Sequence, residues 1–80
     1  MYQEEYYVVY PEGDIQAIAA PLPFNSLVDL NGNLLEFPLK THRMIAYRVQ
    51  RTVRKEQKGL TEVLYYLELV PAEELKNYVQ

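Results

Sequence analysis

Carboxylates, one histidine and one serine are the side chains that could carry chemistry in this 80-residue sequence. Asp29, Asn31 and Asn33 are spaced like the first ligands of a calcium-binding loop. Such a loop needs Gly at its sixth position and Glu at its twelfth, and counting from Asp29 these positions hold Leu34 and Lys40. We therefore interpret the segment as a polar turn and predict no metal site.

His42 and Ser26 are the candidates for a general base and a nucleophile. A lone histidine cannot form a cluster of histidine ligands, and His42 precedes a long strand-forming run, where a solvated side chain is common. Ser26 follows a proline-rich connection and lacks the Gly-x-Ser-x-Gly pattern of serine hydrolases. The sequence contains no cysteine, which removes thiolate nucleophiles, thiolate ligands and disulfides. It predicts a protein that is not an enzyme and that needs no cofactor.

The charged residues are segregated along the chain. Residues 1–39 hold six acidic residues and no Lys or Arg, whereas residues 40–58 hold seven Lys and Arg and one Glu. A basic segment that includes an aromatic residue is typical of nucleic-acid-binding proteins. The net charge of the whole chain is -3, which opposes binding to phosphates. In the nucleic-acid hypothesis, the contacting residues are Lys40, Arg43, Arg51, Lys55 and Lys58.

Hydrophobic alternation and turn residues predict the elements that must position these side chains. Pro11-Glu12-Gly13 and Asn31-Gly32-Asn33 are typical hairpin turns, because glycine permits a positive φ. The two prolines of Pro21–Ser26 exclude a helix and a central strand from that connection. Three hairpins are expected, with strands at residues 5–10 and 14–19, 27–30 and 34–37, and 43–55 and 60–70.

The third hairpin allows its register to be predicted. A three-residue loop at Gln57-Lys58-Gly59 makes the numbers of opposed residues sum to 116. This register places Arg51 beside Tyr65 on a mostly apolar face. On the other face it predicts two cross-strand charge pairs, Arg48–Glu68 and Arg54–Glu62.

A short amphipathic helix is predicted over residues 71–79. Pro71 suits the first helical position, and Leu75, Tyr78 and Val79 have helical spacing. No helix separates the strands, so we expect antiparallel pairing. The predicted fold class is mainly β: a small antiparallel barrel or strongly bent sheet of three hairpins with a short C-terminal helix, forming one domain over residues 1–80.

The outer face of the long hairpin carries an apolar group between the two charge pairs. Its members are Ala46, Leu64, Tyr66 and Val70. An apolar centre with a charged rim is typical of protein interfaces, so we predict a non-catalytic protein-interaction or assembly module that forms a homodimer or binds a protein partner. Two alternatives stay open: the terminal helix or the Pro21–Ser26 connection covers this face, or the basic segment 40–58 binds single-stranded nucleic acid. No apolar run has the length of a membrane span, and a cytoplasmic location is expected.

Overall fold

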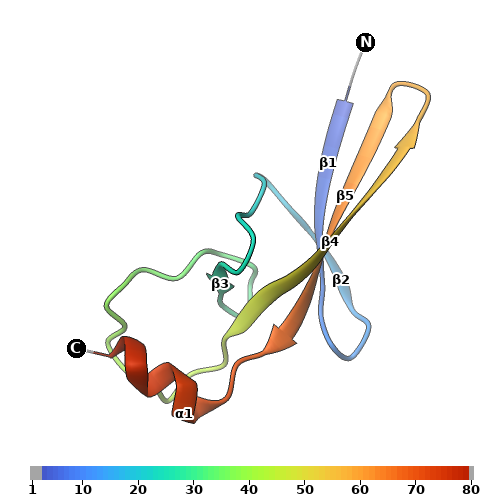
Figure 1. The fold of residues 1–80 in the computed structure, drawn as a ribbon. Helices are drawn as coiled ribbons and strands as arrows, with labels where there is room; N and C mark the ends of the chain where they lie inside the picture. Colours follow the sequence, from blue (N-terminus) through green and yellow to red (C-terminus); the bar gives the residue numbers. More distant parts are fainter. Residues whose placement is uncertain (1–2, 80) are drawn as a thin grey trace.

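The computed structural model describes residues 3–79, which form five strands followed by a short helix (Figure 1). The strands are β1 (Gln3–Val9), β2 (Ile15–Ile18), β3 (Leu27–Val28), β4 (Tyr47–Gln57) and β5 (Leu60–Leu69), and the helix α1 (Ala72–Leu75) continues into a 3-10 turn, η1 (Lys76–Tyr78). The molecule is elongated, at 46 × 23 × 17 Å, with the tip of the β4–β5 hairpin at one end and α1 at the other. The predicted fold class is confirmed, since the sheet forms a strongly curled half-barrel.

The strand order β2-β1-β5-β4-β3 brings the first strand beside the last one. β1 runs parallel to β5, with Tyr7 opposite Leu64 and Val8 opposite Tyr65. The other strand pairs are antiparallel, as predicted, and this parallel pair departs from that prediction. A parallel pair needs a long return connection, and here β2, β3 and β4 provide it without a crossover helix.

The second predicted hairpin is reduced to a short strand and a turn. β3 has two residues, and residue Val28 forms one isolated bridge with Leu34. The predicted polar turn is present, because the carboxylate of Asp29 accepts hydrogen bonds from the backbone N–H of Asn31 (2.8 Å) and Asn33 (3.0 Å). These hydrogen bonds stabilise the turn. The segment between the turn and β4 forms no regular strand or helix.

The predicted register of the β4–β5 hairpin is confirmed at its base and is shifted by one residue beyond Val49. The three pairs at the base sum to 116: Tyr47–Leu69, Arg48–Glu68 and Val49–Leu67. A β-bulge between Val49 and Arg51 then changes the sum to 117, and the loop shortens to Lys58 and Gly59. The bulged residue, Gln50, is exposed and polar, so the hydrophobic pattern gives no sign of the insertion.

The shift corrects the second predicted charge pair. Arg54 faces Val63 rather than Glu62, and Lys55 takes the place opposite Glu62. The guanidinium of Arg54 instead lies 3.6 Å from the carboxylate of Glu4 on β1. The two arginines expected to share one face of β4 are therefore on opposite faces.

The main hydrophobic core lies on one face of the sheet, here called the core face. Its buried side chains are Val8, Tyr10, Val28, Tyr47, Val49, Val63, Tyr65 and Leu67. The rings of Tyr10 and Tyr47 meet edge to face with centroids 5.1 Å apart, and the hydroxyl of Tyr10 donates to the carbonyl of Leu30 (2.9 Å). Burial is the main cause that raises the pKa of both tyrosines.

A second, smaller core lies on the opposite face, at the end occupied by α1. Its buried members are Leu27, Leu39, Ala46, Val70 and Leu75. Leu39 anchors the preceding loop here, since its backbone N–H donates to the carbonyl of Tyr78 (2.8 Å). A helix of four residues gains its stability from such packing, so α1 and this core depend on each other.

We expect Gly59→Val to lower the free energy of unfolding by about 1–2 kcal/mol, because the φ of Gly59 is +73° and a β-branched side chain disfavours that conformation. Urea denaturation measures the change. Lys58→Val in the same turn is the matched control, since Lys58 has an ordinary negative φ. Equal losses in the two variants would contradict the role assigned to the backbone of Gly59.

Candidate interaction surface

An apolar patch lies on the face opposite the core face and is built by four neighbouring strands. We call it the Leu64 patch; it consists of Tyr7, Val9, Ile15, Val53, Leu64 and Tyr66. Leu64 on the central strand β5 lies between Tyr7 of β1 and Val53 of β4. The next row along the strands holds Val9 and Tyr66. Pairing places these side chains on one face because opposed residues in adjacent strands point the same way.

No strand or helix of the described part of the chain lies over the Leu64 patch. Apart from the contact between α1 and η1, the contacts between elements are those between neighbours in the sheet. Ile15, at the β2 edge, is 60% exposed, while Leu64 at the centre is 9% exposed. A shallow groove of about 310 Å³ runs between them, lined by Tyr7, Ile15, Lys55, Glu62 and Leu64. Ile15 is exposed, Leu64 is buried and the other four members are half-buried, so the patch is partly accessible to solvent.

The structure separates the four residues that the sequence groups as an interface. Leu64 and Tyr66 belong to the Leu64 patch, whereas Ala46 (0% exposed) and Val70 (3%) are buried in the smaller core beneath α1. The alternative in which the terminal helix covers this face is therefore correct for Ala46 and Val70. These two residues are not part of the candidate surface. The helix closes one half of this face and leaves the other half open.

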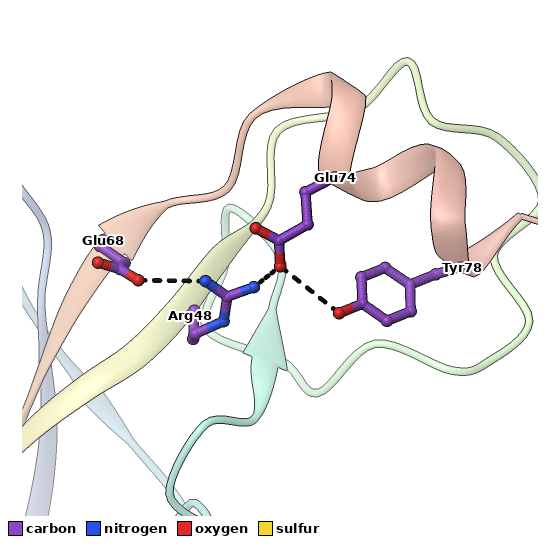
Figure 2. A network of polar contacts seen from close by, with 4 residues as sticks. All are labelled: Arg48, Glu68, Glu74 and Tyr78. Carbon is purple, nitrogen blue, oxygen red and sulfur yellow. Dashed lines mark hydrogen bonds and ion pairs between the residues drawn. The ribbon is translucent and has the colours of Figure 1, made fainter.

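A polar network marks the boundary between the two halves (Figure 2). The guanidinium of Arg48 lies 3.2 Å from the carboxylate of Glu68 and also contacts the carboxylate of Glu74 on α1. The hydroxyl of Tyr78 donates to the same carboxylate of Glu74 (3.5 Å). The predicted Arg48–Glu68 pair is confirmed, and its extension to Glu74 ties the helix to the sheet.

Arg51 forms part of the rim of the Leu64 patch. Its guanidinium carbon lies 4.4 Å from the centroid of the Tyr66 ring, in the geometry of a cation–π contact. The predicted neighbour, Tyr65, is on the core face, whereas the bulge in β4 turns Arg51 to the opposite face. The stacked arginine keeps a charged group directly beside apolar surface.

The opposite rim of the patch carries charges of both signs. Glu5, Glu62 and Lys55 occupy the row before Leu64, and the carboxylate of Glu5 accepts a hydrogen bond from the hydroxyl of Tyr7 (2.8 Å). That hydrogen bond, followed by burial, raises the pKa of Tyr7. Along the strands, the surface therefore has charged residues at both ends and apolar residues between them.

The five candidate contacts for nucleic acid are not brought together. Lys40 follows Leu39, which bridges to Val79 at the α1 end of the molecule. Lys55 and Lys58 lie near the hairpin tip at the opposite end of the molecule. Arg51 lies on β4, between that tip and the α1 end. Arg43 belongs to the loop before β4, where its backbone N–H donates to the side chain of Thr41 (3.0 Å).

The residues with possible catalytic chemistry have local structural contacts. The hydroxyl of Ser26 donates to the carbonyl of Pro23 (2.7 Å), which stabilises the turn before β3. Within residues 3–79, the structure brings no three His, Asp or Glu side chains together in a group able to hold a metal ion. Over the same residues, it has no helix of the length and apolar character needed to span a bilayer.

The sequence interpretation misses four members of the Leu64 patch. Tyr7, Val9 and Ile15 reach it through the parallel pairing of β1 with β5, and Val53 reaches it through the bulge in β4. One signal does point to the first two. The uninterrupted apolar run from Tyr6 to Tyr10 is typical of a strand that packs on both faces.

Comparison with curated proteins and with solved structures gives no match. A family described as "Uncharacterised Treponema protein" has a model that matches residues 2–78. Because this match extends over almost the whole sequence, the chain belongs to that family.

Proposed function

We propose that this protein is a non-catalytic interaction module that binds another protein chain through the Leu64 patch. The observation that carries the proposal is the division of one sheet face into two apolar halves, one of which is buried together with Leu75 of α1. The other half combines aromatic and aliphatic side chains with a charged rim, as protein interfaces do. Burial of the apolar surface that is still exposed at the patch would contribute favourably to partner binding.

The charge distribution favours this function over nucleic-acid binding. Arg48 and Arg54 are held in ion pairs with carboxylates of the same chain. Lys40 and Lys58 lie toward opposite ends of a 46 Å molecule. A phosphate backbone is bound best by a contiguous set of unpaired cations. The proposed module works in the cytoplasm, a location that rests on the sequence alone.

Photocrosslinking at two equally exposed positions tests the proposed function. Ile15 in the patch and Leu69 on the other face of β5 are 60% and 59% exposed, so each is replaced in turn by a photoreactive phenylalanine in cells that produce the protein. We expect a discrete protein adduct from position 15 alone, and its loss when Val53→Glu places a charge in the patch. Adducts of equal yield from both positions, or none from position 15, would overturn the proposal. Circular dichroism confirms that each variant is folded.

A further inference from the structure

We propose that the partner protein supplies an extended basic segment, which joins the sheet as a new strand beside β2. The inference rests on the proposed function, because β2 borders the Leu64 patch, and it adds the conformation and the charge of the segment that binds. It is carried by three observations: unpaired backbone groups on β2, a groove along this strand, and carboxylates at both of its ends.

β2 is the last strand at one edge of the sheet, and part of its backbone has no hydrogen-bond partner. The backbone N–H of Tyr10 donates to the carbonyl of Asp14 (2.8 Å), and the register continues from this pair without a shift. Backbone groups of successive residues in an antiparallel strand point to opposite sides. The N–H and C=O groups of Ile15 and Ala17 therefore point away from β1, and within residues 3–79 no hydrogen bond reaches them.

The edge of β2 lacks the features that usually prevent pairing with another chain, which are charged side chains, proline and bulges. The four residues of β2 are uncharged and include no proline, and the first three are exposed. The edge at β3 differs, because β3 has two residues and the carbonyl of Leu27 accepts a hydrogen bond from the backbone N–H of Leu35 (3.0 Å). An open edge of this kind binds extended peptides through main-chain hydrogen bonds.

Grooves on both faces of the sheet have room for the side chains of an added strand. One, of about 350 Å³, lies between β2 and the turn at residues 31–33, and no charged residue lines it. The other is the groove of about 310 Å³ between Ile15 and Leu64, where the charges of Lys55 and Glu62 offset each other. Side chains of a strand alternate between the two faces, so the added strand is expected to carry apolar residues on both.

Carboxylates border β2 at both ends. Glu12 and Asp14 precede it, and Glu4 and Glu5 share a groove of about 210 Å³ with its last residues. Arg54 pairs with Glu4, whereas the other three carboxylates have no ion pair within residues 3–79. Charge complementarity therefore favours a segment with Lys or Arg. It disfavours a second copy, because the β2 edge of that copy carries the same carboxylates.

Binding of selected peptides tests the proposal. A phage-displayed library of random peptides of about twelve residues, enough for one strand and its flanks, is selected on the purified protein. Fluorescence anisotropy then gives the affinity of each labelled peptide. Ala17→Pro removes one outward N–H at an edge position that tolerates proline, and should weaken binding about tenfold or more. Ala17→Thr keeps the N–H and is the matched control, expected within about threefold of wild type.

A second pair of variants tests the charge of the segment. The selected peptides should be basic, and Glu12→Lys should weaken their binding about threefold or more. Glu36→Lys makes the same change of charge at an exposed position outside β2 and its borders, and should have little effect.

Photocrosslinking in cells separates failure of this inference from failure of the proposed function. We expect the adduct from position 15 to be lost with Ala17→Pro and kept with Ala17→Thr. An adduct that survives Ala17→Pro overturns strand addition while the interaction function stands. If position 15 gives no adduct in any variant, the proposed function falls too.

The remaining outcomes also decide the question. A selection that yields no peptide or only acidic peptides overturns the proposal, as does equal binding by Ala17→Pro and Ala17→Thr. A wild-type dimer in analytical ultracentrifugation that Ala17→Pro dissociates would identify a second copy as the occupant and overturn it as well. Melting curves establish that the variants are folded. If Ala17→Pro does not fold, Ile15→Pro removes the other outward N–H and repeats the peptide measurement.

Discussion

Leu75→Ala should lower the free energy of unfolding by about 2–4 kcal/mol, the range for removing a large side chain from a packed core. Leu75 is 0% exposed and is the buried residue that α1 contributes to the smaller core. A domain of this length has a total stability of about 4–12 kcal/mol, so the loss is a large share of it. Urea denaturation followed by circular dichroism measures the change.

Leu69→Ala is the matched control for this prediction. Leu69 is the same residue type but is 59% exposed at the end of β5. We expect its replacement to change the free energy of unfolding by about 0.5 kcal/mol or less. If Leu75→Ala cost no more than Leu69→Ala, α1 would not be docked on the sheet, and the division of that face into a covered and an open half would fail with it.

Gly32→Val should also lower the free energy of unfolding by about 2–5 kcal/mol, for two separate reasons. The φ of Gly32 is +81°, which costs a non-glycine residue about 1–2 kcal/mol. A Cβ at this position would also lie 3.1 Å from a methyl carbon of Ile18 and 3.6 Å from one of Val8, and overpacking of this kind costs about 1–3 kcal/mol. The turn at residues 31–33 lies so close to β1 and β2 that a side chain at position 32 would force Ile18 to shift.

Gly13→Val separates the two contributions to the Gly32 effect. Gly13 also has a positive φ, +103°, but a Cβ there would meet no atom within 4 Å. We expect Gly13→Val to show the backbone penalty without the packing penalty, and thus a smaller change in the urea midpoint. A loss as large as that of Gly32→Val would indicate that packing around Gly32 is loose.

Local features of this fold are accessible from the sequence, because local chemistry determines them. Glycine in a turn predicts a positive φ at residues 13, 32 and 59, and all three have it. Pro71 and the two glutamates that follow Ala72 predict the start of α1 to within one residue, since Pro71 is the N-cap and not the first helical residue. The alternation on both sides of the Lys58-Gly59 turn predicts β4 and β5. It also predicts their register at the base of the hairpin, from Tyr47 to Val49. Each of these inferences needs only residues that are close in sequence or joined by one turn.

The features that the sequence does not predict depend on residues that are far apart in the chain, or on a residue that leaves the hydrophobic pattern unchanged. The pairing of β1 with β5 joins Gln3 to Leu60, and no local signal selects that partner from the other strands. The bulge at Gln50 adds one exposed polar residue to a strand that already alternates. Both features decide the membership of the Leu64 patch. Leu64 and Tyr66 were therefore identifiable in the sequence, whereas Ile15 and Val53 were not.

The parallel pairing of β1 with β5 has a consequence for the order in which the chain folds. Protein synthesis proceeds from the N-terminus, so β1 and β2 leave the ribosome well before Leu60 is added to the chain. A two-stranded hairpin by itself is only marginally stable in water. The β4–β5 hairpin closes through a two-residue turn, whereas β1 must wait for β5 to close a loop of more than fifty residues. The sheet is thus assembled from its C-terminal side, and the first strand to be made is among the last to find its place.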